Sequence, residues 1–255
     1  MAITEIFPNP TVKQVAFEIR FPNLFYLENK IGDVQVKVMS QFPESALLFR
    51  RQIVVADLGP GAKTEDIESQ VDKGFATKIW RFRSPKGIEL DVSTDSLVLR
   101  SVHHKTYNLE GADKFRDIMK FAVDSFIDVT AVPVLSRIGL RYIDECPIPS
   151  KDNRTFRSYY NSTFPLDRFD LSSATEMGFQ AAVRVGDHYL RYVESLKQIE
   201  PDKYVLILDF DGFATKIAPK DYLTVADALH ATIAHAYETT IREPVLEYMR
   251  QARGG

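Results

Sequence analysis

The stretch VLSRIGLRYIDEC, residues Val134–Cys146, lies near the middle of the 255-residue chain and decides the fold class. Its side chains alternate in character. One side of the alternation is mostly apolar and consists of Val134, Ser136, Ile138, Leu140 and Tyr142. The other side consists of Leu135, Arg137, Gly139, Arg141 and Ile143. A period of two is typical of a β-strand whose two faces meet different surroundings. We therefore predict a long strand with one apolar face and one face that carries arginines.

The segments on the two sides of this strand predict a similar order of elements. In each half, a long alternating strand is followed by a series of hairpin-linked strands and then by an amphipathic helix. Predicted strands cover residues 12–21, 46–56, 75–83, 87–92, 96–103, 134–146, 177–185, 188–196 and 204–210. Predicted helices cover residues 24–42, 111–130 and 224–250, and Pro244 is expected to kink or split the last helix near Ile241.

Hairpin-linked strands pair antiparallel, so the sequence predicts an α+β protein with antiparallel sheets covered by helices. The N-terminal half, residues 1–131, and the C-terminal half, residues 132–255, are expected to pack into one compact unit. Their similar element order indicates a pseudo-duplication that would produce two similar sheets. No residue string repeats between the halves, so the alternative that the two orders agree by chance stays open.

Composition narrows the class of protein. Hydrophobic residues make up 45% of the chain and charged residues 26%, which is typical of a folded globular protein. The net charge of -3 disfavours nucleic-acid binding by bulk electrostatics. The single cysteine, Cys146, excludes an intramolecular disulfide and a zinc site built on cysteines. No secretory signal and no apolar run long enough to span a bilayer is evident, so we expect a cytoplasmic protein without membrane contact.

The arginines of the predicted strands are the strongest functional signal. Their planar forks of N–H donors suit carboxylates and phosphates. Gly139, between two of them, favours a close approach by a ligand or another chain. The alternative is a solvated sheet face on which opposite charges pair across strands. We predict a ligand-binding role for Arg137, Arg141, Arg184, Arg191, Arg81 and Arg83, and we note that Arg20 and Arg100 also fall in strands.

Other candidate motifs do not meet the requirements of a metal, cofactor or catalytic site. His230 and His235 are five residues apart, whereas two ligands on one helix face need a spacing of three or four. Residues 209–212 (DFDG) are expected to end a strand in a glycine turn, and residues 59–64 (GPGAKT) lack the glycine spacing of a phosphate loop. Cys146 has no neighbouring sequence feature that would activate it as a nucleophile. We therefore predict no metal and no cofactor, and assign no catalytic residue.

Two motifs carry a resemblance to a known family. Residues 9–21 (NPTVKQVAFEIRF) form a proline-then-alternating strand, and residues 137–143 (RIGLRYI) form the core of the central strand. With these, the chain resembles a sporadically distributed prokaryotic family of uncharacterised proteins of about the same length. The resemblance covers nearly the whole chain, and it implies a bacterial, cytosolic, single-unit protein without an evident catalytic motif. It brings no substrate and no functional residues.

We expect, from these observations, a non-enzymatic binding or interaction protein. Its arginine-rich sheet face would bind an anionic small molecule or a protein partner. The alternative is an enzyme that acts on a phosphorylated or nucleotide-like substrate, with Glu89, Asp91 or Asp209 as acid, base or metal ligand. Nucleic-acid binding is a weaker, third hypothesis. Unpaired sheet edges would also allow a homodimer.

Overall fold

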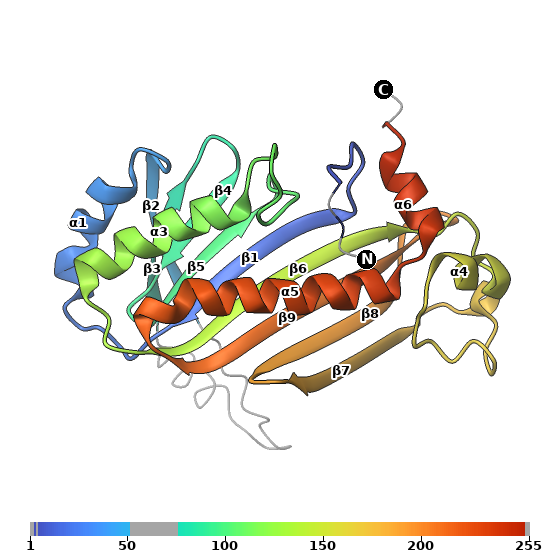
Figure 1. Cartoon of the computed structure of the whole chain (residues 1–255). Coiled ribbons are helices and arrows are strands. Elements are labelled where there is room, and N and C mark those ends of the chain that lie inside the picture. Colours follow the sequence, from blue (N-terminus) through green and yellow to red (C-terminus); the bar gives the residue numbers. More distant parts are fainter. Residues whose placement is uncertain (1–2, 4, 52–75, 253–255) are drawn as a thin grey trace, which may run out of the picture.

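A single antiparallel sheet forms the framework of the protein (Figure 1). The structure is a computed structural model, and it describes residues 3, 5–51 and 76–252. Nine strands of these residues pair in the order β2-β3-β4-β5-β1-β6-β9-β8-β7. They are β1 (Val12–Arg20), β2 (Glu44–Arg51), β3 (Ala76–Arg83), β4 (Ile88–Val92), β5 (Ser96–Ser101), β6 (Leu135–Pro147), β7 (Gly178–Val185), β8 (His188–Glu200) and β9 (Lys203–Ile217). The helices are α1 (Leu27–Val38), α3 (Phe115–Thr130), α4 (Asn153–Tyr159), α5 (Tyr222–Thr240) and α6 (Glu243–Arg250).

The predicted central strand is β6, which pairs with β1 on one side and β9 on the other. The alternating side chains of β6 lie on two different faces of the sheet, as predicted. Ile138 and Leu140 are completely buried beneath the helices, whereas Arg137 and Arg141 lie on the opposite face and remain partly exposed. β1 follows the same pattern, because Phe17 is buried directly opposite Leu140.

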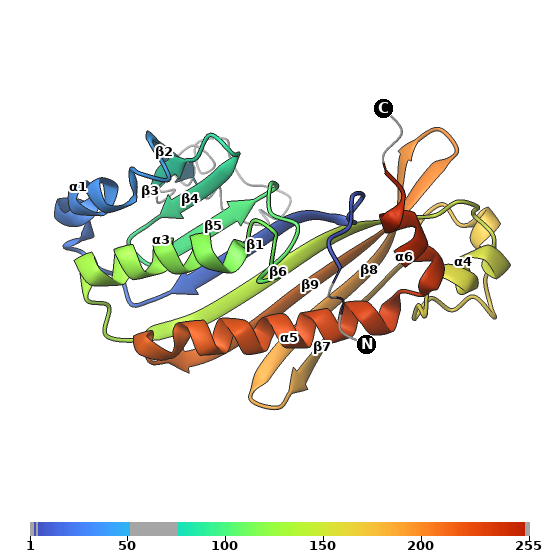
Figure 2. The same ribbon diagram turned by 45° about the horizontal axis from the view of Figure 1, so that its top comes forward.

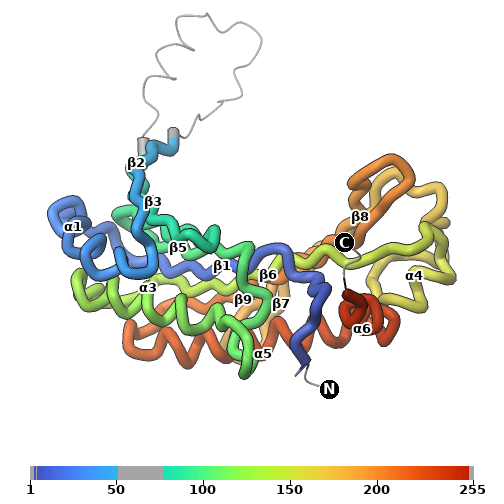
Figure 3. Tube along the Cα trace, turned by 90° about the horizontal axis from the view of Figure 1, so that it is seen from above, coloured from blue at the N-terminus to red at the C-terminus, as the bar shows by residue number. Residues whose placement is uncertain are grey.

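The long helices cover only one face of the sheet (Figures 1 and 2). α3 contributes Met119 and Phe126 to the core, and α5 contributes Leu229 and Ile233; all four are almost fully buried. Each buried side chain of this size stabilises the fold by about 1.5–3 kcal/mol. Seen from above, the strands β2 and β3 and the turn between β8 and β9 rise on the side away from α3 and α5 (Figure 3). The uncovered face is therefore concave.

The two halves of the chain contribute to one continuous sheet rather than to the two sheets that the sequence indicated. In the first half, β1 pairs with β5, the last strand of its hairpin series. In the second half, β6 likewise pairs with β9, the last strand of the following series. The strand order is therefore alike in both halves, and β1 and β6 join them at the centre. The predicted antiparallel α+β architecture is confirmed.

Two predictions in the C-terminal half can be compared directly with the structure. The prediction that residues 209–212 end a strand in a turn is wrong, because β9 continues through them to Ile217. Gly212 is needed for packing instead: a Cβ there would lie 3.3 Å from Ile233 of α5. The prediction of a split near Ile241 is confirmed, since α5 ends at Thr240 and α6 begins at Glu243 with Pro244 in its first turn.

Part of one predicted strand lies outside the described residues. Of the strand predicted over residues 46–56, the structure describes only the portion that belongs to β2, and residues 59–64 are outside it altogether. Among the described helices, none has the length and apolar character that crossing a membrane requires.

Candidate functional site

The concave face carries the charged side chains of the sheet. Residues that are directly opposite each other in an antiparallel pair share a face. Arg100 is opposite both Glu89 and Ala16, and Arg141 is opposite both Ala16 and Asp211. By this register all the strand arginines named above lie on the concave face, namely Arg20, Arg81, Arg83, Arg100, Arg137, Arg141, Arg184 and Arg191.

A groove of about 590 Å³ crosses the middle of this face, centred on β1, β5 and β6 and bordered by residues of β2, β3, β4 and β9. Gly139 and Ala16 lie in its floor, where small side chains leave room. The charges in its walls nearly balance. They are the cations Arg20, Arg50, Arg100, Arg137 and Arg141 and the carboxylates Glu18, Asp91, Asp95 and Asp211.

Arg137 is the central cation of the groove, and Gly139 makes room for it. The Arg137 guanidinium donates to Glu18 on one side and to Asp211 on the other, the latter at 3.0 and 3.1 Å. It also lies 4.9 Å from the centre of the Phe213 ring, which adds a cation–π contact. A Cβ on Gly139 would overlap the Arg137 guanidinium. The close approach that the sequence indicated at Gly139 is thus made by a side chain of the same strand.

Three arginines of the groove are exposed, namely Arg20, Arg50 and Arg141. Arg141 binds Asp209 through two parallel hydrogen bonds of 2.8 and 2.6 Å, and this bond to Asp209 raises the pKa of Arg141. Arg20 lies 3.0 Å from Glu18. Half or more of the side-chain surface of Arg141 and Arg20 is exposed, compared with 20% for Arg137. A ligand in the groove would therefore reach Arg20, Arg50 and Arg141 before Arg137.

A second ionic network occupies the β3–β5 side. Asp91 is almost fully buried and accepts two hydrogen bonds from Arg81, at 2.7 and 2.8 Å, and one from Arg100 at 2.6 Å. Burial acts to raise the pKa of Asp91, but the hydrogen bonds from Arg81 and Arg100 outweigh it and hold the pKa below its usual range. Glu89 bridges Arg81 and Arg83 in the same way. Asp91 is thus an ionised carboxylate whose oxygens already accept hydrogen bonds from Arg81 and Arg100.

The described residues supply little catalytic chemistry. No group of three histidine, cysteine, aspartate or glutamate side chains among them is arranged to hold a metal ion. Cys146 is completely buried, and burial raises the pKa of its thiol, which keeps it neutral. Asp211 differs from Asp91, because burial raises its pKa despite the charge of Arg137. It is the groove carboxyl that comes nearest to the properties of a general acid or base.

The arginines predicted as ligands fall in three places. Arg137 and Arg141 line the groove, whereas Arg81 and Arg83 lie beside it in the β3–β4 network. Arg184 and Arg191 lie on β7 and β8, where they contact Gly186 and Gln180 and do not border the groove. The structure therefore brings only the first pair together with Arg20 and Arg100.

Sequence reasoning missed Asp95 of the β4–β5 turn, Arg50 and Asp211 as groove residues. Arg50 of β2 follows Leu48 at a spacing of two, and Asp211 follows Asp209 at the same spacing. In both cases the spacing of two indicated that the residue lies on the same face of the strand as its neighbour. It was overlooked for Arg50 because the predicted strand ran on to residue 56, and for Asp211 because a turn was expected there.

Comparisons of the chain with models of protein families, with curated proteins and with solved structures found no match. The resemblance to a prokaryotic family therefore stays a prediction, and the site has to be interpreted from its geometry.

Proposed function

We propose that this protein is a non-enzymatic binding protein that holds an anionic ligand or a protein partner on its concave face. The observation that supports it is the groove, which gathers arginines that the sequence singled out and leaves two of them accessible. Of the two kinds of ligand, the geometry favours a segment of a partner protein that carries charges of both signs.

The reason is the charge balance of the groove. Arg20, Arg100, Arg137 and Arg141 each form an ion pair with a carboxylate of the chain. A small anion that took over Arg137 would leave Asp211 without the cation that donates to it, and breaking a partly buried pair in this way costs up to about 3–5 kcal/mol. Exposed pairs are weak, about 0–1 kcal/mol, so they can exchange partners at little cost. A partner segment with its own acidic and basic side chains can engage Arg20 and Arg141 and replace the contacts that it breaks.

The test compares two double variants of equal charge. Arg20→Gln/Arg141→Gln removes two of the three exposed cations of the groove, whereas Arg157→Gln/Arg168→Gln removes two exposed arginines from α4 and the loop that follows it, away from the groove. Each tagged protein is purified gently from its own host and examined by native mass spectrometry. We expect a stoichiometric protein partner on the wild type and the control variant and its loss from the groove variant. A partner that both variants retain equally would contradict the proposal, and so would a wild type that carries nothing.

The enzyme alternative has one observation in its favour. Glu89, Asp91 and Asp209 all lie on the concave face, as an active site built from them requires. Only Asp91 borders the groove, however, and its ion pairs occupy it. Asp211 is the better acid or base within this alternative. Turnover of ATP or p-nitrophenyl phosphate that Asp211→Asn abolishes would favour an enzyme over a binding protein.

A further inference from the structure

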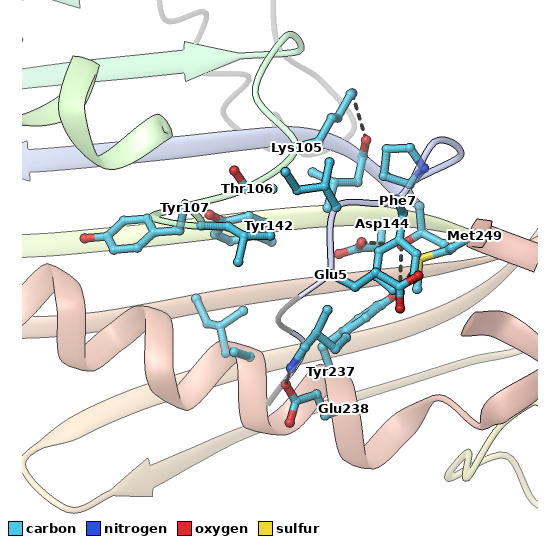
Figure 4. Close-up of a pocket in the computed structure, with 18 of the residues that line it drawn as sticks. Glu5, Phe7, Lys105, Thr106, Tyr107, Tyr142, Asp144, Tyr237, Glu238 and Met249 are labelled. Carbon is cyan, nitrogen blue, oxygen red and sulfur yellow. Dashed lines mark hydrogen bonds between the residues drawn. The ribbon is translucent and has the colours of Figure 1, made fainter. Parts of the chain in front are cut away.

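A second cavity lies on the helix side of the sheet, separate from the concave groove. It has a volume of about 180 Å³, is partly open to solvent, and is lined by β6, α5, the loop at residues 105–109 and the N-terminal segment (Figure 4). A cavity of roughly 150 Å³ in a protein core is large enough to hold benzene. This cavity can therefore accept a molecule with a single ring.

A buried carboxyl group lies in the wall of this cavity. Asp144 follows Ile138, Leu140 and Tyr142 on the apolar side of β6, and it is only 2% exposed. Thr11 Oγ1 donates a hydrogen bond of 2.8 Å to Asp144, and the Tyr237 hydroxyl lies 2.7 Å from the same Thr11 oxygen. A carboxyl on a core face is costly to bury, and a single neutral donor does not offset the cost of its charged form.

The described residues of the N-terminal segment lie between β1 and α5 and border one side of the cavity (Figure 4). The backbone N–H of Ile3 donates to Glu238 at 2.7 Å, and the backbone N–H of Asn9 donates to the Met249 carbonyl at 3.0 Å. These contacts hold Phe7 of the segment against the core. One side of the cavity is thus bordered by a segment that is attached to the helices through Ile3 and Asn9.

The walls combine aromatic rings with a surplus of negative charge. The aromatic side chains that line the cavity include Phe7, Tyr107, Tyr142 and Tyr237. Its charged side chains are the acids Glu5, Asp144 and Glu238 and the base Lys105. The Lys105 ammonium donates to the carbonyls of Val12 and Val102. Burial lowers the pKa of the remaining basic group, His230, to about 4, so that it adds no positive charge at neutral pH.

One polar atom beside the cavity lacks a partner within the described part of the chain. The hydroxyl of Tyr142 is buried and makes no hydrogen bond there. Leaving such a group unsatisfied costs about 1–3 kcal/mol. A ligand with N–H donors that entered between Tyr142 and Asp144 could satisfy this oxygen and the carboxyl together.

We propose that this cavity binds a small organic ammonium ion, with its apolar body among the aromatic rings and its ammonium group at Asp144. Aromatic faces attract cations, most strongly where water is excluded, and a buried carboxylate supplies the counter-charge. An anionic ligand would meet the carboxyl group of Asp144, whereas Glu5 is already paired with Arg250. A neutral ligand would add no positive charge to that of Lys105, which already acts on Asp144.

Three probes of equal shape test this proposal: benzylamine as the cation, benzyl alcohol as the neutral molecule and benzoate as the anion. Binding to the full-length protein at pH 8 is measured by calorimetry. Nuclear Overhauser effects between the ligand ring and the methyl groups of Ile233 and Met249 locate the ligand. We expect benzylamine to bind at least about tenfold more tightly than benzyl alcohol, which corresponds to 1.4 kcal/mol, and benzoate not to bind.

The Asp144→Asn variant should lose this preference for the cation while keeping weak binding of benzyl alcohol. Asp128→Asn, which removes an exposed carboxylate from α3, is the matched control and should behave as the wild type. Equal affinities for amine and alcohol, or no binding of any probe, would overturn the proposal. Because the Overhauser effects are measured on the wild type, the outcome does not depend on the folding of a variant.

The β2 edge of the sheet carries a second, independent inference. β2 ends the strand order, so its outer edge is unpaired among the described residues. Leu47 and Phe49 on its helix-side face are 50% and 60% exposed, and Val36 and Met39 of the neighbouring α1 are exposed by more than half. We infer that this edge pairs with β2 of a second copy around a two-fold axis at Leu47. In that register Glu44 of each copy is opposite Arg50 of the other, so the edge is complementary to itself.

A charge-exchange series tests this pairing by sedimentation velocity. Glu44→Arg and Arg50→Glu each place like charges opposite one another, and each should shift the dimer toward monomer. The double variant Glu44→Arg/Arg50→Glu restores opposite charges and should restore the dimer. A wild type that sediments as a monomer, or a double variant no more dimeric than the single ones, would refute this register.

Discussion

Replacing Asp144 with asparagine should make the protein more stable at alkaline pH, and the size of the effect follows from the burial of this carboxyl. Burial raises the pKa of Asp144 from 3.8 to about 7, and the hydrogen bond from Thr11 offsets only part of that rise. Because the folded state disfavours the ionised form, the wild type loses stability as the pH rises through the interval between these two values. The loss is absent below 3.8 and complete above about 7.

The expected difference is on the order of 3 kcal/mol between pH 5 and pH 8, since each pKa unit corresponds to about 1.4 kcal/mol. Asparagine keeps an oxygen that accepts from Thr11 and cannot ionise. The free energy of unfolding of Asp144→Asn should therefore depend on pH less steeply than that of the wild type, and should exceed it at pH 8.

Urea unfolding at pH 5, 6, 7 and 8 measures both curves. The other titratable groups around the cavity, namely Glu5, Lys105, His230, Tyr237, Glu238 and Cys146, are present in both proteins, so their contributions cancel in the difference. Asp128→Asn controls for the loss of a carboxylate at the surface. Parallel curves for the wild type and Asp144→Asn would refute the reasoning, because they would show that Asp144 titrates alike in the folded and unfolded chain.

Three further substitutions test the packing around β6. Gly139→Ala should cost about 1–2 kcal/mol, because its Cβ displaces the Arg137 guanidinium from Glu18; urea unfolding measures this loss. Arg137→Gln should cost up to about 3 kcal/mol, since it leaves Asp211 without the cation that donates to it and Glu18 with Arg20 alone. In the double variant Arg137→Gln/Gly139→Ala, the Gly139→Ala change should add little to the loss of stability caused by Arg137→Gln. If the two losses are additive, the Cβ at residue 139 does not clash with Arg137. Tyr142→Phe removes a buried hydroxyl that has no partner among the described residues, so thermal unfolding should show equal or higher stability, by up to about 1 kcal/mol.

The fold could be predicted from the sequence where one side of an element meets the core and the other does not. The alternation around Arg137 and Arg141 identified β6 and both of its faces, and the position of Pro244 located the break between α5 and α6. The single sheet could not be predicted in this way, because strand periodicity does not specify which strands pair. That choice depends on β1 and β6, whose paired residues Val15 and Tyr142 are far apart in the sequence.

For the candidate site, the sequence predicted only which face of the sheet carries the arginines. Their partners depend on register: the pairing of Arg141 with Asp209 and of Arg137 with Asp211 follows from the alignment of β6 with β9. Asp144 was missed as a site residue, although the sequence indicated it. It occupies a position of the alternating strand that should face the core, where a carboxylate is unusual.

The central pairing of β1 with β6 also constrains how the chain is made. During synthesis the first half, from β1 to α3, leaves the ribosome with β1 as an open edge, and its natural neighbour appears only when β6 follows. An unpaired strand flanked by apolar residues is a template for pairing with other chains. A polypeptide truncated before β6 should therefore aggregate, and completion of the sheet at its centre is the step that protects the newly made protein.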